Sequence, residues 1–175
     1  AAVALSIELQ HDLLEADWGT DAFDATYLDL MNEKDASGAA AASYCEPAGV
    51  WRGIRVRVGV NTGPVEARLD EVTRGYDYYG PVVNSAARVE GVGHGGQVLI
   101  TEATRAALEA DGAWPPPDTA VTPLGPQPLR GVDAPVELLQ LIPVDLAARR
   151  FPGLRLDVDH APVPETSASE NDVNA

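Results

Sequence analysis

The sequence Ile-Arg-Val-Arg-Val-Gly-Val at residues 54–60 alternates apolar residues with Arg or Gly. A period of two is typical of a β-strand that buries one face, so this stretch sets the start of a sheet. Residues 61–64, Asn-Thr-Gly-Pro, form a predicted turn. In 65–70 apolar residues again occupy every second position, which predicts the returning strand of a hairpin with 54–60. The Tyr- and Gly-rich stretch 74–80 is then expected to be a loop.

Downstream of this loop, helical and strand patterns alternate. A helix is expected at 82–89, because Pro81 would occupy its first turn, where the missing N–H of proline is not needed. The Gly residues between 91 and 96 are expected to end this helix. Further elements are predicted as a buried strand at 97–100, a helix at 101–110 capped by Thr101, and strands at 120–122 and 136–142.

Upstream, the residues indicate helices and then an insert. Apolar residues recur every fourth position in 3–16, which predicts an amphipathic helix, and a shorter helical pattern covers 23–31. The Ala-, Ser- and Gly-rich stretch 35–50 is expected to be a loop insert, and 158–175 an acidic disordered tail. We therefore expect one domain at 1–157 of the α/β (α+β) class, with a mixed, largely antiparallel sheet flanked by helices.

Charge and composition exclude several kinds of function. The formal net charge is −15, from 27 acidic and 12 basic side chains, so we expect no nucleic-acid partner. A phosphate-bearing ligand would need locally placed Arg or Lys residues, or a metal ion. The three histidines lie far apart and show no zinc spacing, so no metal site is predicted within this chain. No apolar run approaches the roughly 20 residues that span a bilayer, so this segment itself is expected to make no membrane contact.

Two polar side chains on the predicted 82–89 helix are candidates for chemistry. Asn84 and Arg88 are four residues apart, so both project from the same helix face. The planar guanidinium of Arg matches the oxygen atoms of a phosphate group. An isolated pair of this kind is most often simply solvated on a surface helix, and that alternative stays open on these residues alone.

Several longer motifs occur together and in order. They are RVRVGVNTGPV at 55–65, GYDYYGPVVNSAARVE at 75–90, GGQVLIT at 95–101, and LRGV followed by PVELLQL between 129 and 141. Together they resemble the class III nucleotide cyclases over residues 51–157. DEVTRGYDYYG at 70–80 and RRFPGLRLD at 149–157 are similar in particular to the trypanosomatid receptor-type adenylate cyclases. The resemblance implies the cyclase (ferredoxin-like) fold, incomplete at its N-terminus.

The resemblance also implies roles for individual residues. Asn84 matches the asparagine that orients the ribose, and Arg88 the arginine that stabilises charge on the α-phosphate as the 3′-oxygen attacks. Asp77 matches the aspartate that accepts a hydrogen bond from the adenine amino group, which favours ATP over GTP. Arg130 falls where the family places a basic residue on the triphosphate, although a surface Arg at a strand end is nearly as common. The implied reaction converts ATP to 3′,5′-cyclic AMP and pyrophosphate for signalling.

The resemblance further implies cofactors, partners and location. Members of the family use Mg²⁺ or Mn²⁺, held by two aspartates in an N-terminal part of the domain that we expect this chain to lack, so the chain alone is expected to be inactive. The implied partner is a second cyclase domain in a head-to-tail homodimer, and Tyr76, Tyr78 and Tyr79 are candidate interface residues. Receptor-type members are single-span membrane proteins, which places this domain at the cytoplasmic side of the plasma membrane. Two alternatives remain open: a cyclase-like pseudoenzyme that binds nucleotide or dimerises, and an unrelated α/β interaction domain.

Overall fold

The computed structural model describes residues 1–34 and 49–156, so most of the expected 35–50 insert and the expected 158–175 tail lie outside it. The elements are α1 (Ala2–Glu15), α2 (Ala22–Lys34), β1 (Val58–Val60), β2 (Glu66–Leu69), β3 (Tyr76–Tyr79), α4 (Pro81–Val92), β4 (Val98–Thr101), α5 (Glu102–Ala110), β5 (Thr119–Gln127), β6 (Val136–Pro143) and the 3-10 turn η1 (Val144–Leu146). Among the helices of these residues, none is both long and apolar enough to cross a membrane.

The main sheet has the strand order β1-β4-β6-β5. β1 runs parallel to β4, while β4 pairs antiparallel with β6 and β6 antiparallel with β5. The prediction of a mixed, largely antiparallel sheet is therefore confirmed. β5 contains Pro123 and Pro126, which its position at the edge of the sheet permits, because an edge strand needs backbone donors on one side only.

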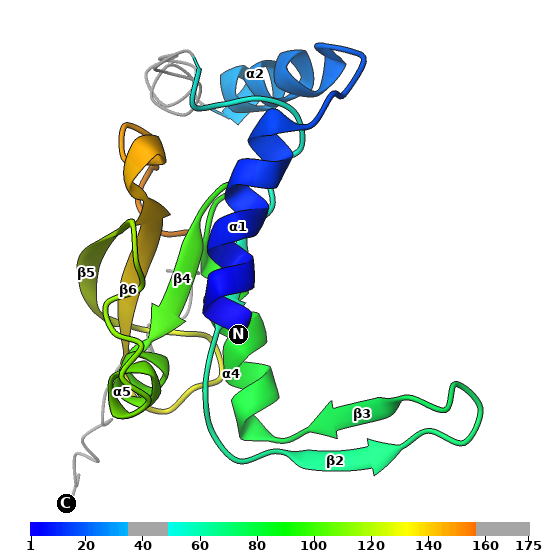
Figure 1. The fold of residues 1–175 in the computed structure, drawn as a ribbon, viewed down its shortest axis with the longest axis vertical. Coiled ribbons are helices and arrows are strands. Elements are labelled where there is room, and N and C mark those ends of the chain that lie inside the picture. Colours follow the sequence, from blue (N-terminus) through cyan, green and yellow to red (C-terminus); the bar gives the residue numbers. More distant parts are fainter. Residues whose placement is uncertain (35–48, 157–175) are drawn as a thin grey trace, which may run out of the picture.

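The core lies on both faces of β4, whose Val98, Leu99 and Ile100 are completely buried. Successive strand residues point to opposite faces, so these three side chains divide between two apolar clusters. Val98 and Ile100 pack in the cluster that Val3 of α1 joins. Leu99 packs in a second cluster, which lies on the side of α4. The buried members of this cluster are Val89, Val92, Leu99, Leu129 and Leu138. Figure 1 shows α1 lying across one face of the sheet.

The predicted hairpin between 54–60 and 65–70 is wrong. β2 pairs with β3 in a separate two-stranded ribbon, and the expected loop at 74–80 contains the strand β3. All residues of both strands are exposed, so the alternation in 65–70 reflects a solvated ribbon and not one buried face. In Figure 1 this ribbon, which we call the arm, extends away from the body of the domain. Only Val58–Val60 of the expected 54–60 strand is paired.

The turn of the arm is closed by a carboxylate. Asp70 Oδ1 accepts hydrogen bonds from the backbone N–H groups of Val72 at 2.7 Å and Thr73 at 2.9 Å. The hydrogen bond from Thr73 contributes most and that from Val72 next. Both favour the charged form of the carboxylate and hold the pKa of Asp70 below its ordinary value. The backbone N–H of Asp70 donates to the carbonyl of Gly75, and that of Arg74 donates to the carbonyl of Asp70, so backbone hydrogen bonds also close the turn.

The helix boundaries follow local signals. Pro81 begins α4, as predicted, but the helix continues through Gly91 to Val92, so Gly91 does not end it. Thr101 caps α5 as predicted, because its side-chain oxygen accepts from the N–H of Thr104 at 3.3 Å.

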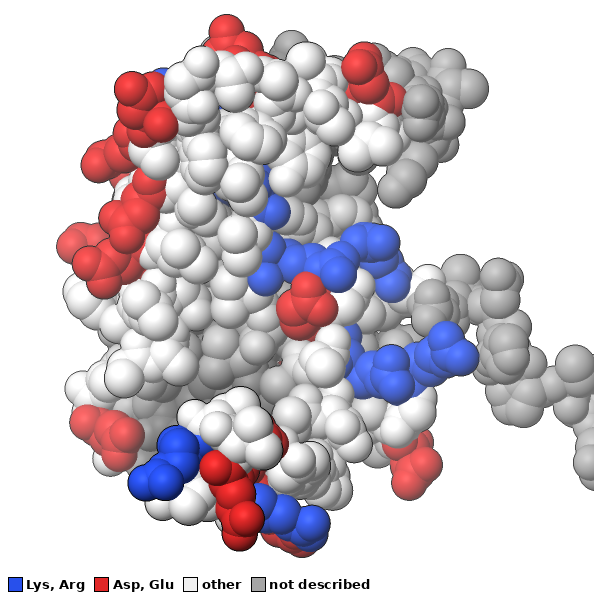
Figure 2. Space-filling view, turned by 90° about the vertical axis from the view of Figure 1, so that its right-hand side faces the viewer, with Lys and Arg blue, Asp and Glu red and all other residues white. Residues whose placement is uncertain are grey.

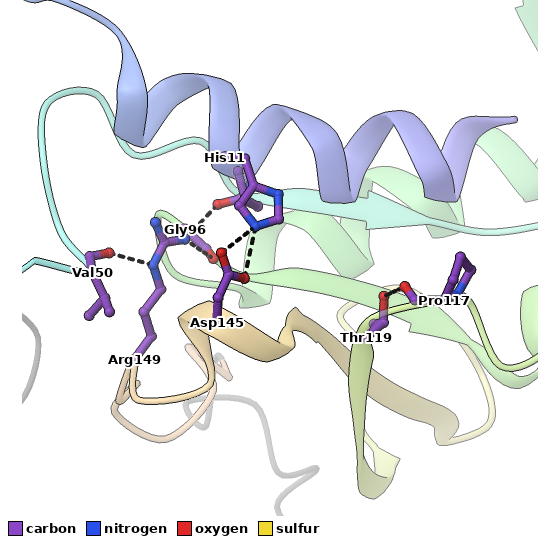
Figure 3. A network of polar contacts seen from close by, with 8 residues as sticks. His11, Val50, Gly96, Pro117, Thr119, Asp145 and Arg149 are labelled. Atoms are coloured by element: carbon purple, nitrogen blue, oxygen red, sulfur yellow. Dashed lines mark hydrogen bonds and ion pairs between the residues drawn. The ribbon is translucent and has the colours of Figure 1, made fainter.

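The buried side chain of Arg149 connects three segments that are distant in the sequence. Arg149 donates to the Val50 carbonyl at 2.7 Å, to Gln10 Oε1 at 2.9 Å and to the Gly96 carbonyl at 3.4 Å. Its guanidinium also lies 4.7 Å from the centroid of the Trp51 ring. Figure 3 shows this network beside the contact of His11 with Asp145. The RRFPGLRLD motif therefore has a structural role at its first residues.

Candidate functional site

The candidate site is built on α4, which approaches β1 very closely. Gly59 of β1 has no side chain at the point where the backbone of α4 passes, and a Cβ there would stand 2.8 Å from the carbonyl oxygen of Ala86. The buried face of α4 presents Val89 and Val92 to the core. Asn84 and Arg88 are exposed on the helix, one turn apart, as the spacing predicted.

A pocket of about 180 Å³ opens beside the C-terminal half of α4. Three segments that are distant in the sequence form its wall: α4, the connection between β5 and β6, and the chain after η1. Each contributes one guanidinium. The lining residues are Ala87, Arg88, Gly91, Val92, Pro128, Arg130 and Arg155. Arg88 and Arg130, two of the predicted site residues, therefore line the same pocket.

Arg130 reaches the pocket because its neighbours fix the chain. Leu129 is buried in the cluster under α4, with 4% of its surface exposed. Gly131 has a φ of 71°, a conformation that side chains other than glycine rarely adopt, and the N–H of Val132 donates to the Leu129 carbonyl at 3.1 Å. This tight turn holds Arg130 at the pocket edge, exposed to solvent.

Asp77 does not line this pocket. It lies on β3 of the arm, exposed, and is paired in register with Arg68 of β2. Gly80, with a φ of 124°, joins the arm to α4. The structure thus brings Arg88 and Arg130 together with Asn84 a turn away, whereas Asp77 stands on a separate element that meets the N-terminus of the same helix.

Positive charge gathers on one face of an acidic molecule. Figure 2 shows Lys and Arg side chains near the middle of this face, while many acidic side chains lie along one edge. Several arginines are neutralised locally, such as Arg57 by Glu90 and Arg105 by Glu102. Arg88 and Arg155, by contrast, have no carboxylate ion pair within the described part of the chain. Two permanent positive charges in the pocket are therefore available to an anion.

A metal site would require several ligand side chains placed close together. Residues 1–34 and 49–156 contain no group of three or more His, Cys, Asp or Glu side chains placed to hold a metal ion. The metal-binding aspartates that the resemblance implies are not assigned to any of these residues.

The sequence prediction missed two features of the site. Arg155 was not singled out, although the RRFPGLRLD motif contains it. The sequence prediction also did not indicate the contact of His94, whose Nε2 lies 2.8 Å from the carbonyl oxygen of Gly153. This contact holds the segment that carries Arg155, and the sequence offers no local signal for it, because the partners are far apart along the chain.

Comparison with known proteins identifies the family of the chain. The family model described as "Adenylate and Guanylate cyclase catalytic domain" matches residues 3–141. The chain belongs to this family. A receptor-type adenylate cyclase of Trypanosoma equiperdum is 46% identical over 90% of the chain, and receptor-type adenylate cyclase B of Leishmania donovani is 44% identical over 97%. The chain spans only 34% and 13% of these two relatives.

Solved structures of the family agree with the fold. Two structures of adenylate cyclases from Trypanosoma brucei, described in their monomeric state, superpose with TM-scores of 0.77 and 0.78 at 43% and 41% identity. Each match covers 89% of this chain, and 67% and 68% of the solved chains. The resemblance inferred from the motifs, and the cyclase fold it implied, are therefore confirmed.

Proposed function

We propose that this chain is the part of an adenylate cyclase catalytic domain that binds and orients the nucleotide. The reaction is the conversion of ATP to 3′,5′-cyclic AMP and pyrophosphate, for cyclic AMP signalling. The observation that carries the proposal is the pocket shared by Arg88 and Arg130, with Asn84 one helical turn away. Family membership supplies the reaction class, because the relatives are named receptor-type adenylate cyclases.

In the proposed mechanism the ribose 3′-oxygen attacks the α-phosphorus. A new 3′-O–P bond forms, the hydroxyl proton passes to solvent water, and the bond between the α-phosphorus and the oxygen that bridges it to the β-phosphate breaks, which releases pyrophosphate. Arg88 donates to the α-phosphate oxygens, where negative charge develops, and so lowers the barrier. Asn84 orients the ribose, and Arg130 contacts the triphosphate.

Purine recognition is assigned to Asp77, whose carboxylate would accept from the adenine amino group. Because Asp77 stands on the arm and not in the pocket, a nucleotide must extend along the N-terminal half of α4 to meet both. A base held at the arm and phosphates held beside Arg88 would place the ribose near Asn84. This order along the helix agrees with the order of base, ribose and phosphate in ATP.

Mg²⁺ or Mn²⁺ belongs to the proposal as the family's cofactor and would neutralise triphosphate charge. Its ligands would come from residues outside those described. The second partner is another cyclase domain in a head-to-tail homodimer. The exposed tyrosines of the arm support an interface there, since 64% of Tyr76 and 57% of Tyr78 are accessible. The proposed location is the cytoplasmic side of the plasma membrane, within a single-span receptor, and the receptor-type names of the relatives support a membrane receptor.

Replacing the central cation tests this proposal. Arg88→Ala, in the chain assembled with a metal-bearing cyclase domain, should lower kcat for cyclic AMP by about 100- to 1000-fold and change KM little. Arg150→Ala is the matched control, because Arg150 is an exposed arginine outside the pocket. Equal losses in kcat and in ATP affinity would argue for a binding role alone, and no product from a demonstrated assembly would refute the assignment.

The second candidate is a cyclase-like pseudoenzyme that binds nucleotide or dimerises without turnover. The observation that favours it is the pocket of Arg88 and Arg130, which can hold an anion whether or not any bond is broken. Binding of ATP by the assembly without any cyclic AMP, at all concentrations of Mg²⁺ and Mn²⁺, would select this reading.

A further inference from the structure

The segment after η1 brings a third guanidinium, that of Arg155, to the pocket of Arg88 and Arg130. We propose that Arg155 is a binding residue for the polyphosphate of the nucleotide, and for pyrophosphate when it forms. This inference rests on the proposed function, because it deepens the ligand contacts of the same pocket. Nothing in the motif spacing indicated it, since Arg155 follows the last strand.

The position of Arg155 is fixed by its neighbours on both sides. Its backbone N–H donates to the carbonyl of Val92, at the C-terminal end of α4, at 2.9 Å. Leu154 and Leu156 pack against the apolar cluster below that helix. Further back, His94 holds the carbonyl of Gly153. Residues 153–156 are thus held in place, and the exposed side chain of Arg155 forms part of the pocket wall.

Charge identifies the class of ligand. Three guanidiniums surround about 180 Å³ in a chain whose net charge is −15, so the arrangement runs against the overall composition. Like charges that converge repel one another, and an anion with several oxygen atoms relieves this repulsion. Arg88 and Arg155 have no such carboxylate among the residues described. A condensed phosphate carries enough charge and acceptor oxygens for three arginine forks.

The remaining lining favours a phosphate over a purine base. Ala87, Gly91, Val92 and Pro128 add small apolar surface and no side-chain acceptor that would read a purine. A Cβ built on Gly91 meets no atom within 4 Å, so the pocket is open directly above the helix backbone. A larger side chain at Gly91 would fill this space and leave all three arginines in place.

The experiment measures binding of sodium tripolyphosphate, pyrophosphate and orthophosphate to the 175-residue chain by titration calorimetry at low salt. Arg155→Gln should weaken tripolyphosphate and pyrophosphate binding about tenfold. Arg150→Gln is the control, because it removes the same charge from the same segment at an exposed residue outside the pocket. Arg155→Lys should recover part of the affinity, since it restores charge without the planar fork. Unfolding midpoints of all variants should agree.

The outcomes separate this inference from the proposed function. Equal affinities for Arg155→Gln and Arg150→Gln overturn it, even if Arg88→Ala abolishes binding and turnover and so supports the cyclase assignment. A loss of tripolyphosphate affinity in Arg155→Gln but not in Arg150→Gln supports the role of Arg155, even if the assembled enzyme makes no cyclic AMP. Gly91→Leu should also block tripolyphosphate binding with every arginine intact, and unchanged binding in that variant would place the anion elsewhere and overturn the inference. Orthophosphate that binds as tightly as tripolyphosphate would likewise refute a polyphosphate site.

Discussion

Gly59→Ala should displace the helix that carries the site. In the structure a methyl group on Gly59 would stand 2.8 Å from the Ala86 carbonyl oxygen and would overlap the backbone of Glu90. Ordinary contact begins at 3.4 Å, so α4 must move away from β1 by more than about half an ångström. Both obstacles are main-chain atoms, so no side chain can rotate to make room.

The loss of folding free energy in Gly59→Ala follows from the rigidity of these main-chain atoms. Overpacking in a well-packed core costs typically about 1–3 kcal/mol, and we expect the upper end here, about 3 kcal/mol, because only a shift of the whole helix relieves the clash. For a domain of this size 1 kcal/mol lowers the unfolding midpoint by about 2–4 °C, so the expected loss is about 6–12 °C. Moving α4 also moves Asn84 and Arg88 relative to Arg130, so turnover in an assembled cyclase should fall as well.

Urea denaturation of the isolated chain gives the free energy of unfolding directly. The matched control is Gly91→Ala on the same helix, where the added Cβ meets nothing within 4 Å. That variant should gain about 0.5–1 kcal/mol, because Ala is the better helix former. The reasoning is refuted if Gly59→Ala loses less than about 0.5 kcal/mol, or if the two variants change stability in the same direction.

Other predictions follow from the network of Figure 3 and from the arm. Arg149→Ala should cost about 3 kcal/mol in urea denaturation, because three acceptors lose their donor. The hydrogen bond from His11 holds the pKa of Asp145 below its ordinary 3.8. His11→Ala should therefore destabilise the chain at pH 6. Its deficit should begin to shrink as the pH falls through 3.8, the ordinary pKa at which the unfolded chain takes up the proton, and should vanish only below the lowered pKa of the folded carboxylate. A deficit that stays constant over this whole range contradicts the linkage. Gly80→Ala should cost about 2 kcal/mol, because φ at 124° strains any side chain, and NMR should show shifts along the arm.

Local signals in the sequence predicted most helices and the central strand. Thr101 before an amphipathic run predicts the capped start of α5, and the apolar run at 97–100 predicts a strand buried on both faces. The pairing of the first hairpin was wrong because alternation specifies a strand but not its partner. In β2 the alternating residues are all exposed, so the usual reason for alternation, one buried face, does not apply.

The candidate site, too, was only partly predictable from the sequence. Asn84 and Arg88 were predictable because a helix places residues four apart on one face. The meeting of Arg88 with Arg130 and Arg155 was not, because it depends on the strand order, which puts the connection after β5 and the segment after η1 beside α4. Spacing along the chain contains no information on that order. Family resemblance supplied Arg130, and only the fold supplied Arg155.

One apolar cluster unites the three guanidiniums. Val89 follows Arg88 directly, Leu129 precedes Arg130, and Leu154 and Leu156 flank Arg155; all four apolar residues belong to the cluster between α4 and the sheet. Each long and flexible cation is therefore attached to the main chain next to a side chain that packing has fixed. The entropy of ordering three arginine backbones has been offset during folding, so an anion that enters the pocket has only the side chains left to order. The proposed nucleotide binding would therefore depend on the same packing that positions α4 on β1.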